Sequence, residues 1–364
     1  MTDHRPLTTD HCPPVPQLFV PGRLCLFGEH SDWAGALRRD DPEIVAGACI
    51  VCGTDQGISA RVEAAVDFEL VTHVPGGATR QVTIPMQTRA LRSATEAADF
   101  FSYSAGVAAV VHERYGTGGV RVVVDAVDLP VQRGLSSSAA VCVLVARALS
   151  RVHGLGLSLR EEMELAYQGE IATGSRCGRM DQACAYGKVP VLLRFEGDDP
   201  EVQALAVGGR LHLVIVDLCA GKDTRRILAD LNLCFAGAPT PQRARLRQAL
   251  GDENLKIVEA ARAALAEADA PRLGRLMQEA QALFDRDVAP VCAAELSAPK
   301  LHRILAAPEV SDLVWGGKGV GSQGDGAAQF VCRGAAERSE LMRRLTSRYD
   351  VNCLELTIER GRAG

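Results

Sequence analysis

Near the middle of the chain, small and hydroxyl-bearing residues lead directly into a long apolar segment. The sequence reads GLSSSAA over residues 134–140 and continues as VCVLVARALSRVHG to Gly154. The apolar run predicts a buried helix that ends near Gly154. Because the first turn of a helix leaves N–H groups unpaired, and small side chains admit a phosphate, we predict a phosphate-binding helix N-terminus. The alternative is a serine-capped helix that binds nothing. The chain has no GxxxxGK[ST] loop, so ordinary P-loop machinery is not expected.

The order of the remaining patterns indicates a mixed fold. Strand-like runs fill much of residues 18–75, and GGVRVVVDAVDL alternates as a strand over residues 118–129. A helical pattern lies near residues 96–114, and residues 239–307 are mostly helical. The last strand is expected at VNCLELTIE. Strands and helices in this order favour an α+β protein of two lobes.

The length agrees with two lobes, because 364 residues exceed one typical hydrophobic core. The texture of the sequence changes near residue 205. We therefore predict a flexible N-terminal tail over residues 1–17, an N-terminal domain over 18–205 and a C-terminal domain over 206–364.

Composition argues against several classes of protein. The net charge of −5 disfavours a nucleic-acid surface, and no apolar run is long enough to cross a bilayer. No secretory signal opens the chain, and several of the twelve cysteines lie inside apolar runs, so we expect a reducing cytoplasm. Cys49 and Cys52 form a CxxC without a second pair, which favours a strand interior over zinc or redox chemistry.

A second stretch, PGRLCLFGEHSDWAG, places ionisable residues directly after a strand-like run. The run ends at Gly28, and Glu29, His30, Asp32 and Trp33 follow within five positions. Such a cluster is either a ligand pocket or a charged, solvated loop.

A third stretch, GEIATGSRCGRMDQACAYG over residues 169–187, carries two carboxylates of interest. Ser158 and Glu161 form a capping box that starts a helix running to about Ala172. On it Glu170 falls on an apolar stripe, and a buried carboxylate needs a partner, for which Mg²⁺ is suitable near phosphates. Asp181 follows a glycine-rich turn and would be a general base or an N-cap; by itself the N-cap interpretation is favoured.

Two further segments leave alternatives open. GKGVGSQGDG, residues 317–326, matches GxGxxG, but it precedes a strand and lacks a βαβ unit, so a hairpin or a tight turn near a ligand is favoured. AGKDTRRILADLN, residues 220–232, contains Lys222, Arg225 and Arg226, which would meet an anionic substrate. The equally weighted alternative is a solvated basic helix start capped by Asp223.

Together these stretches resemble the GHMP small-molecule kinase superfamily, and within it the galactokinase family. PGRLCLFGEHSDWAG is similar to the family's PGR, hydrophobic strand and GEHTDY; GLSSSA and CGRMDQ are similar to its phosphate loop and its CGIMDQ segment. The resemblance implies a two-lobed fold. Its N-terminal lobe would be like ribosomal protein S5 domain 2, and its C-terminal lobe would be a ferredoxin-like α/β unit.

The resemblance also implies roles for individual residues. Asp181 would stand at the reacting hydroxyl, with Arg23 beside it to stabilise charge on the transferred phosphoryl group. Ser138 and Glu170 would hold Mg²⁺. The ATP phosphates would be wrapped by Gly134, Leu135, Ser136, Ser137, Ser138 and Ala139. The acceptor would be held by Glu29, His30, Asp32 and Trp33.

We therefore expect an ATP- and Mg²⁺-dependent kinase of a sugar, a sugar derivative such as a uronic acid, or a cyclitol, with an anomeric hydroxyl as the leading phosphorylation site. The protein would be a monomer or homodimer. Trp33 replaces the signature tyrosine, and Lys318 and Asp325 interrupt the third motif, residues 316–326; these departures bear on the acceptor. The alternatives are a catalytically silent sugar and ATP sensor, and a mevalonate-type kinase.

Overall fold

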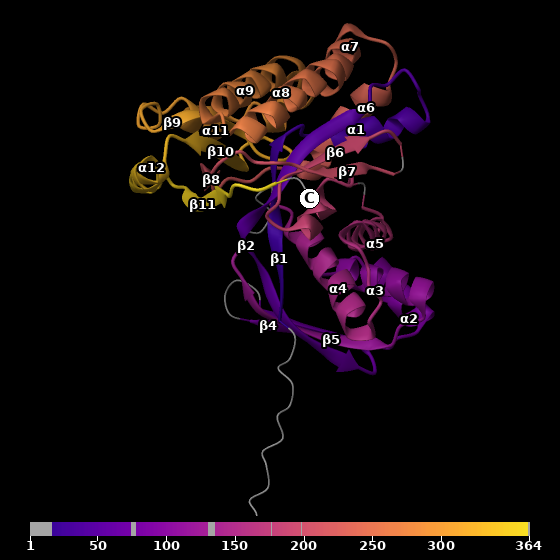
Figure 1. Cartoon of the computed structure of the whole chain (residues 1–364). Helices are drawn as coiled ribbons and strands as arrows, with labels where there is room; N and C mark the ends of the chain where they lie inside the picture. The colour runs from indigo at the N-terminus through magenta and orange to yellow at the C-terminus, as the bar shows by residue number, and fades with distance from the viewer. Residues whose placement is uncertain (1–16, 74–77, 130–134, 176, 198, 363–364) are drawn as a thin grey trace, which may run out of the picture.

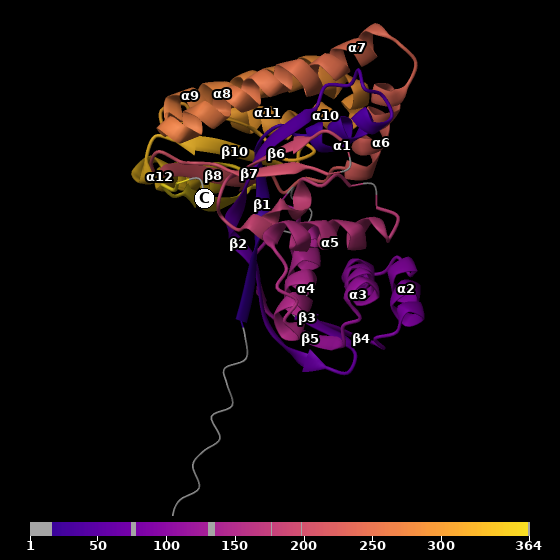
Figure 2. The ribbon, with the colours of Figure 1, turned by 45° about the vertical axis from the view of Figure 1, so that its right-hand side comes forward.

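The computed structural model describes residues 17–73, 78–129, 135–175, 177–197 and 199–362. The expected tail, apart from Gln17, and Gly134 of the phosphate loop lie outside the described residues. Gln17 is already the first residue of a strand. The structure is α+β, with one sheet in each half of the chain (Figures 1 and 2).

The first half builds a seven-stranded sheet with the order β4-β3-β5-β2-β6-β7, and β1 pairs with β2 beside this path. Two strands are longer than their sequence runs suggested, because QLFV and RLCLF join into one strand and β2 also takes in the CxxC segment. Cys49 and Cys52 are accordingly buried, free thiols inside β2. The strands are β1 (Gln17–Phe27), β2 (Gly47–Ala65), β3 (Phe68–His73), β4 (Thr79–Ile84), β5 (Gly119–Val127), β6 (Val191–Phe195) and β7 (Glu201–Ala204).

Four helices of the first half gather on one side of β1–β5 (Figure 1): α2 (Thr88–Glu96), α3 (Ser102–Tyr115), α4 (Ser137–His153) and α5 (Leu159–Ile171). The short helix α1 (Ser31–Ala36) lies apart from them, near α6. The Ser158–Glu161 capping box is confirmed at the start of α5. The helical pattern expected near residues 96–114 corresponds to α3, which begins later than expected, because the Asp99 carboxylate accepts from Phe101 N at 2.8 Å and Ser102 Oγ accepts from Asp99 N at 2.9 Å. These local bonds compete with helical hydrogen bonding and separate α2 from α3.

The second half builds a four-stranded antiparallel sheet with the order β11-β8-β10-β9. Along the chain, β8 is followed by helices, then by the β9–β10 hairpin, α12 and β11. This is the βαββαβ arrangement of a ferredoxin-like unit, as the resemblance implied. The strands are β8 (Leu211–Asp217), β9 (Val314–Gly319), β10 (Ala327–Cys332) and β11 (Asn352–Ile358).

The helices of the second half cover this sheet and reach over the first half. Figure 2 shows α8 and α9 lying together across the sheet, with α6 and α7 near α1. Asp223 caps α6, as one of the two interpretations expected, by accepting from Arg226 N at 3.1 Å. The main helices are α6 (Thr224–Ala236), α7 (Pro241–Gln248), α8 (Asn254–Glu267), α9 (Ala270–Leu283), α10 (Ala293–Leu296), α11 (Pro299–Leu305) and α12 (Ala335–Arg348).

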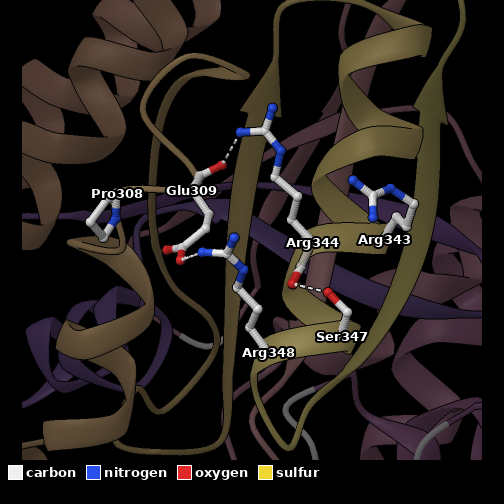
Figure 3. Close-up of a pocket in the computed structure, with 6 residues that line it drawn as sticks. All are labelled: Pro308, Glu309, Arg343, Arg344, Ser347 and Arg348. Carbon is white, nitrogen blue, oxygen red and sulfur yellow. Dashed lines mark hydrogen bonds and ion pairs between the residues drawn. The ribbon is translucent and has the colours of Figure 1, made fainter.

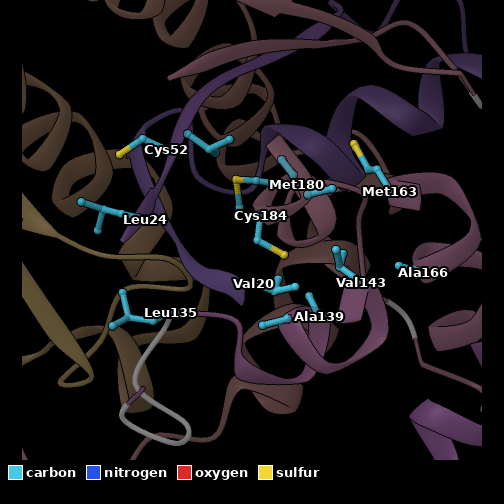
Figure 4. Packing of buried hydrophobic residues seen from close by; sticks show 14 of the residues in the cluster. Val20, Leu24, Cys52, Leu135, Ala139, Val143, Met163, Ala166, Met180 and Cys184 are labelled. Carbon is cyan, nitrogen blue, oxygen red and sulfur yellow. The ribbon is translucent and has the colours of Figure 1, made fainter. Parts of the chain in front are cut away.

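One large hydrophobic cluster runs through both halves. It contains Leu24 of β1 and Val143 of α4 together with Leu213 and Ile215 of β8. Figure 4 shows side chains of β1 and α4 packed with those near Cys184. The predicted boundary near residue 205 lies between β7 and β8, but the apolar core continues across it. The two lobes are therefore packed against each other over a shared core.

A buried polar contact also joins the lobes. Lys318 Nζ of β9 forms an ion pair with the Glu29 carboxylate just after β1, and donates to Gly319 O at 2.9 Å. The two side chains are 1% and 6% exposed. Nearby, Gln329 Nε2 donates to Cys25 O at 2.7 Å. These contacts hold the glycine-rich hairpin against the turn that follows β1.

Replacing Lys318 by Met leaves the Glu29 carboxylate buried without its partner. We expect Lys318→Met to lower the free energy of unfolding by about 3–5 kcal/mol, the usual cost of breaking a buried pair. Urea denaturation at pH 7 measures this change. The control Lys256→Met, whose side chain is 70% exposed, should cost under about 1 kcal/mol. The double variant Glu29→Gln/Lys318→Met should recover part of the loss; a double variant as unstable as the sum of the two single variants would show that the pair is not its source.

Candidate active site

A cavity of about 1190 Å³ opens where the two lobes meet. Its wall includes Arg23 of β1, the start of α4 and residues near Asp181. The second half contributes the residues before and at the start of α6, and the turn at Gly321 and Ser322. The cavity is therefore lined by residues from all three sequence stretches, residues 21–35, 134–140 and 169–187. It is also lined by residues from the two segments whose role was left open, residues 220–232 and 317–326.

Arg23 and Asp181 form the ion pair at the base of this cavity. The Arg23 guanidinium contacts the Asp181 carboxylate and donates to Ser136 Oγ at 2.5 Å. Arg23 is 3% exposed, whereas the Asp181 side chain is 30% exposed and so remains accessible from the cavity. Burial lowers the pKa of Arg23, but the neighbouring Asp181 carboxylate outweighs burial, and the net pKa is raised. Arg23 is therefore a fixed positive charge at this point.

The favoured N-cap interpretation of Asp181 is wrong. Asp181 is the first residue of a short 3₁₀ helix, η2 (Asp181–Tyr186), and Met180 occupies the cap position without a side-chain cap bond. The carboxylate points to Arg23 instead. A residue adjacent in sequence, Gln182, donates to the Glu170 carboxylate at 2.7 Å. The start of η2 therefore carries both Asp181, which pairs with Arg23, and Gln182, which binds the Glu170 carboxylate.

The start of α4 faces the same cavity. Ser136 adopts a left-handed backbone with φ of 55°, and within the described residues no side chain caps the helix. The serine-cap interpretation is therefore wrong: Ser136 Oγ accepts from Arg23, and Ser137 and Ser138 line the cavity. Arg23 N also donates to Leu135 O at 3.0 Å, which ties this loop to β1. The first turn of α4, whose N–H groups lack partners within the helix, thus borders the cavity, as a phosphate site requires.

Ser138 and Glu170 lie close enough to interact. Glu170 is 4% exposed, and burial, with the nearby Asp181 charge, raises the pKa of its carboxyl to about 7. Its partners Gln182 and Ser138 lower that pKa. A hydroxyl and a carboxylate beside a phosphate-binding helix start are the oxygen donors that Mg²⁺ prefers, so the residues fit the ion. The described residues contain no cluster of three or more His, Cys, Asp and Glu that would form an all-protein metal site.

The comparisons with known proteins agree with this geometry. The model of the GHMP kinases N terminal domain matches residues 102–188, which include the start of α4, Glu170 and Asp181. A galactokinase from Thermotoga maritima is 28% identical over 172 residues. The matched part is 46% of this chain and 43% of that protein, so it spans less than half of the relative.

Two solved structures share the fold over nearly the whole chain. The Lactococcus lactis galactokinase complexed with galactose has a TM-score of 0.70 at 17% identity and covers 96% of this chain and 94% of its own. The L. major mevalonate kinase in complex with R-mevalonate has a TM-score of 0.68 at 18% identity, with coverages of 96% and 97%. Residues 102–188 thus match the N-terminal domain of GHMP kinases, and the whole chain shares the fold of galactokinase and mevalonate kinase. Because these two folds match about equally, the overall fold leaves the acceptor open.

His30 and Trp33 form a hydrogen-bonded pair in the wall of the cavity. Trp33 Nε1 donates to His30 Nδ1 at 3.1 Å, and the His30 ring stacks on Phe284 with a centroid distance of 6.0 Å. His30 is 4% exposed and has a left-handed backbone with φ of 66°. Burial lowers the pKa of His30 to about 4, so the ring is neutral at pH 7. Because an indole N–H only donates, Nδ1 is the accepting nitrogen and the proton is on Nε2.

Asp32 is the acceptor-side carboxylate. It is 6% exposed, and burial raises its pKa to about 6, with the Asp181 charge adding to this effect. Gly178 lies directly against it, since a Cβ at this position would overlap the Asp32 carboxylate. The glycine is required because no larger residue would allow the CGRMDQ segment to approach so closely.

The structure places Glu29 differently from its neighbours. His30, Asp32 and Trp33 line the cavity, whereas Glu29 is buried in its ion pair with Lys318 and is not among the lining residues. The Glu29 carboxylate, which the resemblance assigned to the acceptor, is therefore already paired with Lys318. Glu29 contributes to the site as part of its support.

The sequence alone did not indicate the apolar walls of the cavity. Apolar side chains from three separate elements, β3, β5 and α4, line the cavity without a shared motif: Leu70, Val124, Val141 and Leu144. Phe284, which stacks on His30, comes from the helical segment after α9 and likewise has no local signal. Only the folded chain brings these residues together.

A smaller hollow of about 320 Å³ lies on the outer surface beside α12 (Figure 3). Its arginines are already matched by carboxylates: Arg348 pairs with Glu309, and Arg344 pairs with Asp312 at 2.9 Å. The hollow is thus a surface ion-pair network. Elsewhere, none of the helices in the described part of the chain is long and apolar enough to span a membrane.

Asp32 should make the stability of the protein depend on pH. A carboxyl whose pKa is raised from 3.8 to about 6 on folding contributes stability that is fully present below about pH 4 and is lost as the pH rises through 6. Asp32→Asn should abolish this pH-dependent decrease in the free energy of unfolding, which is on the order of 3 kcal/mol at 1.36 kcal/mol per pKa unit. Urea denaturation at pH 4 and pH 8 measures it. Asp350→Asn, at an exposed position, is the control; an equal effect of Asp32→Asn at both pH values would contradict the assignment.

The His30 tautomer is directly testable. In ¹⁵N-labelled protein at pH 7, long-range ¹⁵N–¹H NMR should place the His30 proton on Nε2, because Nδ1 accepts from Trp33. Trp33→Phe keeps the aromatic packing but removes the indole donor, so both tautomers should then be populated. Signals of the more exposed His302 should stay unchanged. A His30 proton on Nδ1 in the unmodified protein would refute this arrangement.

Proposed function

We propose that this protein is an ATP-dependent phosphotransferase that phosphorylates a hydroxyl of a sugar or sugar-like metabolite. The observation that carries the proposal is the Arg23–Asp181 pair at the base of a cavity that also receives the start of α4. The match of residues 102–188 to the GHMP kinases N terminal domain supports a kinase, and galactose in the Lactococcus lactis structure supports a polyhydroxylated acceptor.

The proposed chemistry uses positioning and charge. In phosphoryl transfer the protein mainly aligns the reactants and neutralises charge. We assign Asp181 to orient the acceptor hydroxyl and accept its proton, and Arg23 to stabilise charge on the transferred phosphoryl group. Residues 134–139 would hold the ATP phosphates, with Gly134 outside the described part. Mg²⁺, held by Ser138 and Glu170, would neutralise phosphate charge.

Asp32 and the His30–Trp33 pair would bind the acceptor. An anomeric hydroxyl is the leading phosphorylation site, on the strength of the galactokinase likeness. A sensor that binds sugar and ATP without turnover is the alternative from another class; it has less need of a buried arginine aligned with an accessible carboxylate. A mevalonate-type kinase is the second alternative, and the polar residues His30 and Asp32 argue against its more apolar acceptor.

Asp181→Asn tests the catalytic assignment. In a coupled ADP-release assay with ATP, Mg²⁺ and a panel of neutral sugars, sugar acids, sugar phosphates, cyclitols and mevalonate, the variant should lose about 10²- to 10⁴-fold in kcat, the usual contribution of a positioned acid or base. Nucleotide affinity, measured by calorimetry, should be retained.

The matched control is Asp199→Asn, whose side chain is 81% exposed and pairs with Arg160. It should leave turnover unchanged. Undiminished turnover in Asp181→Asn would refute the role of Asp181. Turnover of mevalonate alone would favour the mevalonate-type reaction.

A further inference from the structure

The acceptor end of the cavity has two chemically different sides. One side carries Asp32 and Asp181, which accept hydrogen bonds from hydroxyl groups. The other is formed by His30, Lys222, Thr224, Arg225 and Ser322. The second side consists of hydrogen-bond donors, two of them positively charged.

His30 is the central donor of this side. Its Nδ1 accepts from Trp33, so the proton is on Nε2, which is buried and makes no hydrogen bond of good geometry within the described residues. The Ser322 backbone acts on this ring as a hydrogen-bond partner that raises its pKa, against the larger effect of burial. A ligand oxygen in the cavity would give this donor a better-placed acceptor than the Ser322 backbone provides.

Lys222 brings a fixed positive charge close to His30. Its Nζ donates to Gln323 O at 2.7 Å, and its chain lies against Gly324 and Gly326. This bond fixes the position of the ammonium at the cavity wall. The charge is near enough to lower the pKa of His30.

Arg225 adds a second charge on the first turn of α6. It lines the cavity, and within the described part of the chain it forms no ion pair. Its neighbour Arg226 instead faces Glu295 and Asp230 at 4.0 and 3.9 Å and is not among the lining residues. Of these two adjacent arginines, only Arg225 is available to the cavity.

We propose that the acceptor of this kinase carries an anionic group, a carboxylate or a phosphate, held by His30, Lys222 and Arg225 while its hydroxyls face Asp32 and Asp181. This inference rests on the proposed function and specifies the substrate class. Charge-assisted hydrogen bonds are about twice as strong as neutral ones, so the anionic group would determine specificity. The ion pair of Glu29 with Lys318 fits this substrate, because it removes one negative charge from the acceptor's surroundings.

The test compares matched acceptors in the ADP-release assay. Each set has the same ring with a neutral, a carboxylate or a phosphate group at C6: galactose, galacturonate and galactose 6-phosphate, and the corresponding glucose and mannose compounds. We expect kcat/KM to favour one of the anionic forms over its neutral counterpart by about 10- to 100-fold. Whichever anion is preferred distinguishes the carboxylate from the phosphate.

Arg225→Gln and Arg226→Gln are the matched variants. Arg225→Gln should reduce the anionic preference by about 10-fold, chiefly through KM, whereas Arg226→Gln should leave it unchanged. Equal kcat/KM for neutral and anionic sugars would overturn this inference and leave the proposed function standing.

Calorimetry with the same sugars, in the presence of ADP and Mg²⁺, separates binding from turnover. Binding of an anionic sugar that Arg225→Gln weakens, without ADP release in any assay, would support the anionic site and overturn the kinase proposal. If no anionic sugar binds and none is turned over, the proposed anionic site is overturned.

Discussion

The buried ion pair between Glu29 and Lys318 is the contact on which the arrangement of the site depends. Two desolvated charges are costly, and their attraction offsets this only in a well-fixed geometry. The pair joins the turn after β1 to the β9–β10 hairpin, so it locates one lobe relative to the other. Next to it, His30 has a left-handed backbone conformation that is tolerated only where the surroundings determine it. The cavity is thus built around a rigid junction.

The charged groups inside the cavity affect one another's pKa values. Burial, with a further contribution from the Asp181 charge, raises the pKa of Asp32 to about 6 and that of Glu170 to about 7. Arg23 is the buried cation that pairs with Asp181 directly. A set of carboxylates held partly protonated by burial is suited to take up a cation and hydroxyl donors. Arg225 of α6 and Lys222 just before it add positive charge to the cavity lining.

Departures from the family pattern acquire a physical meaning in this structure. Trp33 supplies an indole N–H that a tyrosine would replace with a hydroxyl, and so selects the His30 tautomer. Lys318 brings a positive charge into the glycine-rich third motif and forms an ion pair with Glu29. Asp325 accepts from Leu301 N at 2.8 Å and therefore acts in packing. Of these three residues, Trp33 lines the cavity, whereas Lys318 and Asp325 form supporting contacts.

Local patterns in the sequence were sufficient for much of the fold, and they singled out several polar residues that line the cavity. The Ser158–Glu161 capping box, the α4 helix, the final strand and the Asp223 cap follow from hydrogen bonds and periodicity within a few residues. What only the tertiary structure decided is which distant groups meet: Arg23 with Asp181, Glu29 with Lys318, and His30 with Phe284. A local pattern favoured an N-cap for Asp181 because it contains no information about a strand more than 150 residues away. Burial and pairing arise only when the two lobes pack together in the folded chain. They determine the charge of the buried ionisable groups and the tautomer of His30.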